Sequence, residues 1–281
     1  MNETLRVGFV GLGDMGEPMV RHIIAAGFQT TLWARRPASL ARLSDSTFKV
    51  AGDLVDLGRS SDICGVCVFS DEDTLEVTLG DKGVLAGMRK GATLLLHPTI
   101  APETAMRISE AGAARGVAVL DAPVAGTRVR AEEGTLSVMV GGASAAFEHA
   151  LPVLRAYDRD IRHMGPIGSG MRMKALNNLL SRVNLGMAYE ALEIGVKLGM
   201  ERSAVLETLR GSGAASFMLE FLAERVLPDP EYARHLASMS AKDMTLFEQV
   251  RVAAGLERTP LEDAAEHGVR AFGRMGGDSG A

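Results

Sequence analysis

Residues 6–16, RVGFVGLGDMG, decide the fold of this chain. The run Arg6–Val10 is typical of a short buried strand, and it leads without a spacer into the hexapeptide GLGDMG. A helical pattern follows over residues 17–26 and ends at Gly27, and a second strand is expected at residues 30–33. A strand, a G-x-G-x-x-G turn, a helix and a strand within about thirty residues indicate a dinucleotide-binding unit.

Each glycine of this turn has its own physical task. Gly11 permits the tight turn, Gly13 lets the backbone approach a pyrophosphate, and Gly16 lets the helix pack closely on the strand. The helix N-terminus then offers free N–H groups and a positive dipole to the phosphates. We therefore expect the whole turn to bind the cofactor, through Gly11, Leu12, Gly13, Asp14, Met15 and Gly16.

The end of the second strand predicts which cofactor is preferred. NAD sites usually carry Asp or Glu there to bind the ribose hydroxyls. This segment reads Ala34-Arg35-Arg36-Pro37 and has no acid, and a guanidinium favours a 2′-phosphate through paired charge-assisted hydrogen bonds. We expect Ala34, Arg35 and Arg36 to contact NADP(H), with NAD as a possible second cofactor. The alternative is that both arginines are solvated loop residues.

Strand and helix patterns alternate through the first half of the chain. The expected strands are residues 62–69, 92–96, 117–122 and 136–141, and the expected helices are Asp71–Leu79, 102–115 and 143–154. The alternation predicts a mostly parallel sheet with helices on both faces and with ligand loops at the carboxyl ends of its strands. That edge would bring Phe69, Ser70 and Thr99 to the cofactor.

Strand patterns cease after about Gly165. The expected helices are residues 168–202, 203–211, 214–226, 231–237, 239–255 and 260–273, and the tail 276–281 is expected to be disordered. The fold class is therefore an α/β Rossmann-type N-terminal domain followed by an all-α C-terminal domain. We place the first domain at residues 1–164 and the second at residues 165–281, with the chemistry between them.

Composition excludes several classes of protein. The 281 residues are 47% hydrophobic, which favours a packed core over disorder, and a net charge of −5 argues against sequence-independent nucleic-acid binding. Cys64 and Cys67 have the C-x-x-C spacing, but on a buried strand they point to opposite faces, with no second Cys or His cluster nearby. We expect them to be structural, and we expect no metal.

No membrane or secretory segment is apparent in the sequence. The apolar windows are shorter than a membrane span, and residues 1–6 lead directly into the first strand without a secretory apolar region. We therefore expect a cytoplasmic protein that has neither membrane nor nucleic acid as a partner.

The junction between the halves, residues 165–178, reads GPIGSGMRMKALNN. Lys174 and Asn178 are four residues apart, so a helix places them on one face. Their neighbours are mostly apolar, and a lysine on a largely buried helix needs a polar cavity or a partner. The alternative is a solvated lysine and asparagine on an exposed helix.

Four segments, in this order, resemble the β-hydroxyacid dehydrogenase family, which includes 3-hydroxyisobutyrate dehydrogenases and tartronate semialdehyde reductases and is related to 6-phosphogluconate dehydrogenase. They are residues 11–16, residues 121–142 (DAPVAGTRVRAEEGTLSVMVGG), residues 168–178, and the pair Lys242-Asp243. The resemblance spans roughly residues 5–273. It implies an enzyme that transfers hydride between NADP(H) and a small, anionic β-hydroxyacid or its semialdehyde.

The resemblance implies particular roles for three residues. Lys174 would donate a proton to the carbonyl oxygen as hydride reaches the carbon, and would accept it in reverse, with its pKa lowered by desolvation and by Lys242. Asn178 would orient the substrate and Lys174. Lys242 would reach the cofactor and substrate, the alternative being a surface lysine paired with Asp243. The family also implies a homodimer or homotetramer formed through the helical half.

Two loops depart from the family pattern. Ala125-Gly126-Thr127 stands where the family has Ser-Gly-Gly, with Arg130 at a usual glycine, and residues 96–99 (LHPT) replace Asp-x-Ser-Thr. We expect Ala125, Gly126, Thr127 and Arg130 to meet the substrate. Arg128 or Arg130 would pair with its carboxylate, or both would be solvated.

Two further side chains are open to more than one interpretation. His97 would orient the substrate or be a loop or capping residue. Phe217 would shape the pocket or belong to the core.

Two other functions remain open. An imine reductase shares this fold, although such enzymes typically lack the lysine, so Lys174 argues against that class. The other is a catalytically silent NADP-binding protein, which the Lys174 and Asn178 pair disfavours. The substrate itself, the direction of the reaction and the oligomeric state are not determined by the sequence.

Overall fold

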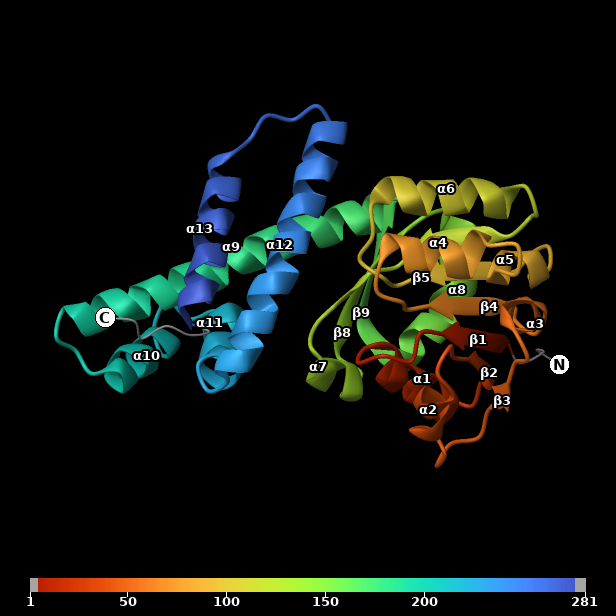
Figure 1. Ribbon diagram of the computed structural model, residues 1–281, viewed down its shortest axis with the longest axis horizontal. Coiled ribbons are helices and arrows are strands. Elements are labelled where there is room, and N and C mark those ends of the chain that lie inside the picture. Colours follow the sequence, from red (N-terminus) through yellow and green to blue (C-terminus); the bar gives the residue numbers. More distant parts are fainter. Residues whose placement is uncertain (1–4, 276–281) are drawn as a thin grey trace. The chain divides into compact units, whose positions relative to one another are not determined.

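The computed structural model describes residues 5–275, and it divides into two compact units that meet between Lys174 and Ala175. The first unit is α/β and the second is helical (Figure 1). The tail 276–281, for which we expected disorder, lies outside the described residues.

The first unit is built on one nine-stranded sheet in the order β3-β2-β1-β4-β5-β6-β8-β7, with β9 paired to β8. Pairing is parallel from β3 through β6, and β8 runs antiparallel to β6 and β7 but parallel to β9. The order 3-2-1-4-5-6 within the parallel part is that of a Rossmann fold, which confirms the predicted class. The strands are β1 (Arg6–Val10), β2 (Gln29–Trp33), β3 (Lys49–Val50), β4 (Ile63–Val66), β5 (Thr93–Leu96), β6 (Ala118–Asp121), β7 (Val124–Ala125), β8 (Leu136–Gly141) and β9 (Asp158–Gly165).

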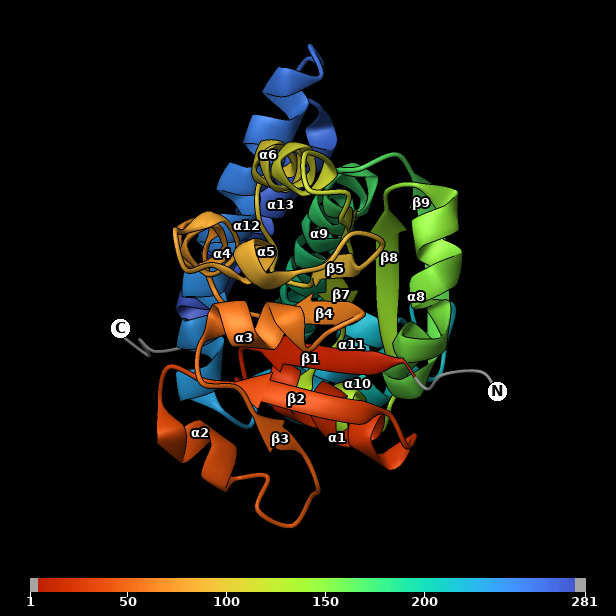
Figure 2. The ribbon, with the colours of Figure 1, turned by 90° about the vertical axis from the view of Figure 1, so that its right-hand side faces the viewer.

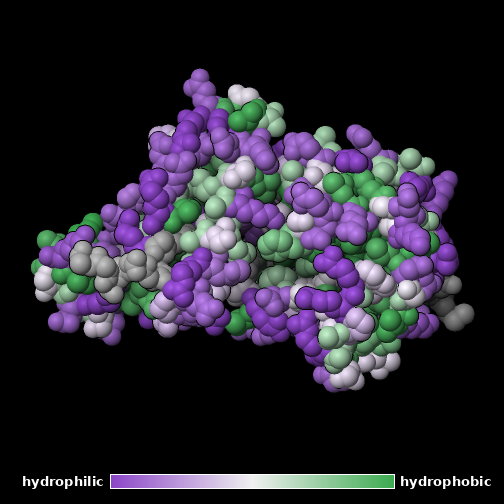
Figure 3. Space-filling model, in the orientation of Figure 1, coloured by the Kyte–Doolittle hydropathy of each residue, from purple (hydrophilic) through white to green (hydrophobic). Residues whose placement is uncertain are grey.

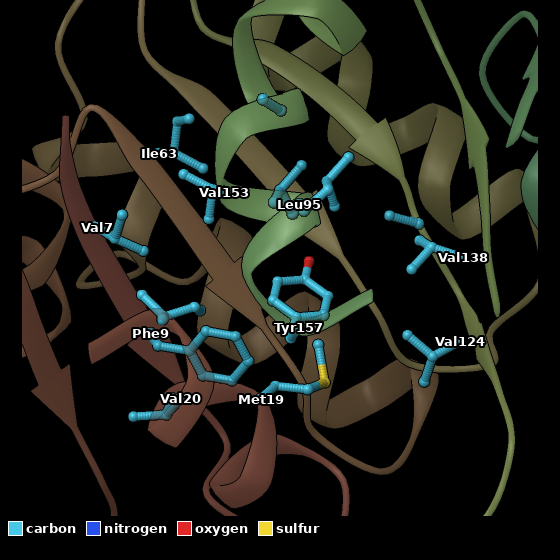
Figure 4. Close-up of a cluster of buried hydrophobic side chains, with 14 of the residues drawn as sticks. Val7, Phe9, Met19, Val20, Ile63, Leu95, Val124, Val138, Val153 and Tyr157 are labelled. Atoms are coloured by element: carbon cyan, nitrogen blue, oxygen red, sulfur yellow. The ribbon is translucent and has the colours of Figure 1, made fainter. Parts of the chain in front are cut away.

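Helices cover both faces of this sheet (Figure 2). Their bounds are α1 (Gly16–Ala25), α2 (Pro37–Ala41), α3 (Leu54–Arg59), α4 (Asp71–Leu79), α5 (Val84–Gly87), α6 (Pro102–Ala113), α7 (Arg128–Glu132) and α8 (Ser144–Tyr157). One buried cluster packs α1 and α8 on the sheet, and Figure 4 shows Phe9, Met19 and Tyr157 close together within it. A second cluster packs α3 to α6 on the opposite face. Both faces are therefore apolar, as expected of a parallel sheet.

Strand β9 is absent from the sequence prediction. Six of its eight residues are charged, histidine or glycine, and most of the strand is exposed on the far side of β8. It lacks the apolar run of a buried strand and the alternation of a half-buried one, so pattern reasoning has no signal to use. The short elements β3, β7, α2, α3, α5 and α7 are missing from the prediction as well.

The second unit consists of helices. Its elements are α9 (Ser169–Lys197), which begins in the first unit, α10 (Arg202–Arg210), α11 (Phe217–Phe221), the π-helical turn η1 (Leu222–Val226), α12 (Pro230–Ala253) and α13 (Pro260–Met275). The predicted break between 231–237 and 239–255 is wrong, because α12 is continuous. Serine is tolerated there because the Ser240 hydroxyl donates to the Leu236 carbonyl one turn back (2.6 Å).

The strand order reverses direction between β1 and β4, and ligands of open α/β sheets bind at such a point. The glycine turn follows β1, and residues 67–70 follow β4. A Cβ atom added to Gly11 would lie 2.2 Å from the Cys67 carbonyl oxygen, so the two segments touch. The fold therefore brings the predicted phosphate turn to the expected edge of the sheet.

Candidate active site

The glycine turn is packed at two of its three glycines and open at the third. Gly11 has φ +97°, a conformation that favours glycine, and a Cβ on Gly16 would lie 1.9 Å from the Gly11 carbonyl oxygen. A Cβ on Gly13 would meet nothing within 4 Å. The turn thus leaves space at Gly13, three residues before α1 begins, where a pyrophosphate can approach the backbone and the helix N-terminus. The residues present fit a dinucleotide.

An ionic network surrounds the first turn of α1, and sequence reasoning missed it. The Glu17 side chain is buried, and three guanidinium groups lie within 3.3–3.7 Å of its carboxylate, from Arg21, Arg42 and Arg128. Arg42 also donates to the Leu12 carbonyl inside the glycine turn. The same arginines also pair with Asp14, Asp45 and Glu132, so the network fixes the start of the helix without giving it a net positive charge.

The end of β2 and the start of α4 lie together at the same edge. The exposed Arg35 guanidinium is 3.7 Å from the Asp73 carboxylate. Ser70 caps α4, because its hydroxyl accepts from the Asp73 N–H (3.1 Å). Arg36 is exposed before α2, Phe69 is exposed after β4, and Thr99 is half-buried after β5. The predicted cofactor residues of this unit therefore follow the ends of neighbouring strands, and their contact with a cofactor stays a prediction.

Arg35→Asp tests the predicted cofactor preference. We expect the ratio of NADP to NAD affinity to fall by about 10–100-fold, because a charge-assisted pair with the 2′-phosphate is lost and a second acid then stands beside Asp73. The measurement is a titration with each dinucleotide followed by the fluorescence of Trp33, the one Trp of the chain. Arg59→Asp, an exposed charge reversal on α3, is the control. An unchanged ratio would contradict the preference.

The predicted substrate segment, residues 125–130, contacts the glycine turn through Arg128. Thr127 caps α7 through its hydroxyl, which accepts from the Arg130 N–H (3.4 Å), and Gly126 has φ +146°. Arg128 lies 2.7 Å from Glu132 and 3.3 Å from Asp14 and contacts Glu17. The suggestion that Arg128 pairs with a substrate carboxylate is therefore disfavoured, because three protein carboxylates already surround it. Arg130 is half-buried, and its role stays a prediction.

His97 follows β5 directly, as a loop residue, but its side chain is part of the core. It is 2% exposed, its ring stacks on Phe9 at 5.9 Å, and it meets Tyr157 edge-on. Burial lowers the pKa of His97 to about 4, so at neutral pH the uncharged ring donates from Nδ1 to the Ala122 carbonyl (2.8 Å). This side chain is not available to orient a substrate.

Asp158 is a second buried titratable group in the same unit. Its Oδ1 accepts from the Asp160 N–H (2.8 Å), while Oδ2 is buried with no hydrogen-bond partner among residues 5–275. Burial raises the pKa of Asp158 to about 6. The folded chain therefore holds this proton at a pH where the unfolded chain has released it, so ionisation of Asp158 lowers the stability as the pH rises from about 4 to about 6.

Asp158→Asn should remove this pH dependence. We expect the free energy of unfolding of the variant, relative to wild type, to increase by about 1–3 kcal/mol between pH 4 and pH 8. The measurement is denaturant unfolding at both pH values followed by the fluorescence of Trp33, which lies on β2 of this unit. A difference that does not change with pH would contradict the assignment.

Helix α9 carries the predicted catalytic lysine in its second turn. The Gly168 and Met171 N–H groups each donate to the Asp121 carboxylate (2.7 Å), so the helix begins against the last residue of β6. Lys174 is half-buried and lies three residues beyond Met171. The carboxyl ends of β1 and β6 lie at one edge of the sheet. Lys174 is therefore anchored at the edge that carries the glycine turn.

The remaining predicted site residues belong to the helical unit. Asn178 is buried on α9, four residues after Lys174, and Phe217 is exposed at the start of α11. Lys242 is exposed on α12, and its neighbour Asp243 pairs with Arg182 of α9 at 2.8 Å. The alternative interpretation of Lys242 is a surface lysine paired with Asp243, and in the structure the Asp243 carboxylate pairs with Arg182.

The described residues give little support to a reactive cysteine pair, a metal site or a membrane-spanning helix. Burial raises the pKa of both Cys64 and Cys67 to about 12, which disfavours the reactive thiolate. Within residues 5–275, no group of three or more His, Cys, Asp or Glu side chains could hold a metal ion. None of the helices in that range is long and apolar enough to cross a membrane.

A Rossmann sheet with a glycine turn at its switch point is typical of a dinucleotide-binding protein. Residues 6–165 match the family model described as the NAD binding domain of 6-phosphogluconate dehydrogenase, and residues 168–280 match the NAD-binding model of NADP-dependent 3-hydroxyisobutyrate dehydrogenase. The chain belongs to the β-hydroxyacid dehydrogenase family of NAD(P)-dependent oxidoreductases, which act on CH–OH groups.

Named relatives cover nearly all of the chain. It is 30% identical over 247 residues to 2-(hydroxymethyl)glutarate dehydrogenase of Eubacterium barkeri, covering 88% of this chain and 82% of the relative. It is 32% identical over 267 residues to NAD-dependent L-serine dehydrogenase of Pseudomonas aeruginosa, covering 92% and 89%. The crystal structure of 3-hydroxyisobutyrate dehydrogenase from Salmonella typhimurium superposes with a TM-score of 0.82 at 26% identity, covering 96% and 93%.

Proposed function

We propose that this enzyme interconverts a small, anionic β-hydroxyacid and its semialdehyde, with NADP(H) preferred over NAD(H) and with Lys174 as the general acid and base. The observation that carries the proposal is the placement of Lys174, which is anchored through Asp121 at the sheet edge that bears the glycine turn. The names of the three relatives support the substrate class. Each denotes a compound with a hydroxymethyl group on the carbon next to a carboxylate.

The cofactor supplies or accepts the hydride when it is bound, and the residues of the chain supply the rest of the chemistry. The glycine turn and the N-terminus of α1 bind the diphosphate, and Arg35 binds the 2′-phosphate. The Lys174 ammonium group donates a proton to the carbonyl oxygen during reduction, and neutral Lys174 takes the alcohol proton during oxidation. Asn178 orients the reacting groups by hydrogen bonding.

Other residues complete the proposed site. Ala125, Gly126, Thr127 and Arg130 follow β6 and meet the substrate, and Phe217 and Lys242 contribute from the helical unit. The Thr127 hydroxyl accepts from the Arg130 N–H to cap α7 and keeps its own O–H donor, which we assign to the substrate.

A reductase screen tests the proposed activity. NADPH oxidation is followed with semialdehydes that carry a carboxylate, aromatic aldehydes, keto acids and cyclic imines, with NADH in parallel. We expect turnover with the carboxylated semialdehydes and faster turnover with NADPH. Turnover with imines alone would assign the chain to the imine reductases. Binding of NADPH without turnover of any compound would favour a silent binding protein.

We also propose that the chain assembles as a homodimer or homotetramer in the cytoplasm. The observation in favour is an apolar stripe along α9 that is exposed in the single chain, with successive spacings that keep it on one helix face. Figure 3 shows apolar surface among polar residues where α9 ends, at its left edge. The stripe consists of Leu176, Leu180, Met187 and Ile194, and Leu198 follows directly after the helix. Light scattering should give a mass of twice or four times 29.8 kDa.

A further inference from the structure

Asp121 is a carboxylate sealed inside the α/β unit. It ends β6, its exposed fraction is 0%, and it opposes Gly141 at the one register pair between β6 and β8. Burial raises its pKa, while the N–H groups of Gly168, Gly170 and Met171 oppose that effect by donating to the carboxylate. Burying a carboxylate costs free energy unless its oxygens accept hydrogen bonds. These N–H groups therefore offset the cost of burying Asp121.

Glycines close the space around this carboxylate. A Cβ on Gly141 would lie 2.3 Å from Asp121 Oδ1, and a Cβ on Gly170 would lie 2.3 Å from the Met139 carbonyl oxygen and 2.9 Å from Asp121 Oδ2. Neither position admits a side chain without movement of the backbone. The first turn of α9 is therefore held directly against the ends of β6 and β8, at a fixed distance.

The Asp121 contact joins two segments of the proposed site. The N–H groups at the start of a helix have no partner within the helix, and here the carboxylate supplies one for Gly168 and for Met171. Lys174 follows within one turn, and the predicted substrate residues, Ala125 to Thr127 and Arg130, begin four positions after Asp121 along the chain. Movement of this carboxylate would change the distance between the lysine and the substrate segment.

We propose that Asp121 is a positioning residue for the reaction, one that sets the place of Lys174 relative to the substrate segment by holding the start of α9 on the end of β6. The proposal rests on the proposed role of Lys174. Because a misplacement of about 1 Å costs about 100-fold in rate, the loss of one of the two 2.7 Å bonds should lower turnover without removing the acid itself.

The test is Asp121→Asn, measured alone and combined with Lys174→Ala. Asn keeps the shape but offers one accepting oxygen, so we expect kcat to fall by about 10–100-fold while the Kd for NADPH changes by less than about 3-fold. In the Lys174→Ala background the same substitution should lower kcat by less than about 3-fold, because the group it positions is gone. Asp53→Ala, which removes the carboxylate that caps α3, is the matched control and should leave kcat unchanged.

Two results would overturn the inference. One is wild-type kcat in Asp121→Asn, and the other is an equal loss of kcat with and without Lys174, which indicates a purely structural role. Wild-type turnover in Lys174→Ala alone would instead overturn the proposed function. The Trp33 unfolding transition shows whether each variant is folded.

Discussion

Lys174→Ala should lower kcat by about 10²–10⁴-fold while the Kd for NADPH stays within about 3-fold of wild type. Alanine cannot donate a proton to the carbonyl oxygen, and the glycine turn and Arg35, which bind the cofactor in our proposal, are unchanged. Steady-state kinetics with the best semialdehyde from the screen, together with a titration followed by Trp33 fluorescence, gives both quantities.

Two further variants separate proton transfer from charge and from folding. Lys174→Arg keeps a positive charge, but a guanidinium does not release its proton near neutral pH, so this variant should be as inactive as alanine. Lys197→Ala changes an exposed lysine in the last turn of the same helix and should be fully active. High activity in Lys174→Arg would show that charge, rather than proton transfer, is what the position supplies.

Gly13→Ala should weaken cofactor binding strongly without reducing stability. The added Cβ meets no atom within 4 Å in the protein, so the unliganded unfolding transition should be that of wild type. The same Cβ occupies the space through which a pyrophosphate approaches the backbone, and we expect the Kd for NADPH to rise by about 100-fold or more, which corresponds to about 2.7 kcal/mol. Denaturant unfolding and fluorescence titration measure the two effects separately.

Gly16→Ala provides the contrast within the same turn. Its Cβ would lie 1.9 Å from the Gly11 carbonyl oxygen, so the turn must shift, and we expect a loss of about 1–3 kcal/mol in stability together with the loss of binding. Gly213→Ala, in a loop of the helical unit where a Cβ also meets nothing within 4 Å, is the neutral control. Tight NADPH binding by Gly13→Ala would show that the dinucleotide does not approach this turn.

The parts of the fold that the sequence predicted are those with strong patterns. β1, β4 and β5 are apolar runs, and the alternation of strands with amphipathic helices fixed the class. β9 was not predicted, because this charged edge strand is held by its pairing with β8 rather than by apolar residues of its own. The false break in α12 falls beside Ser240, whose hydroxyl bonds back to the Leu236 carbonyl within the continuous helix.

The candidate site likewise has residues that local sequence located and contacts that it could not predict. The glycine turn and Arg35 could be located from local sequence, because spacing alone places them at strand ends. The engagement of Arg128, the burial of His97 and the contact of Asp121 with α9 all join residues at least 25 positions apart. No local pattern encodes such contacts. Asp121 was therefore not singled out from the sequence, although it lies at the end of a predicted strand and Gly168 and Gly170 precede the later helix.

The open space at Gly13 has a consequence for how this chain tolerates mutation over time. Gly11 and Gly16 are required by the backbone itself, so any descendant that folds in this way is under pressure to keep them, whether or not it binds a nucleotide. Gly13 is under no such pressure from folding. A lineage that stopped using its cofactor could lose this glycine by drift while keeping the other two, so position 13 distinguishes selection for use from selection for stability.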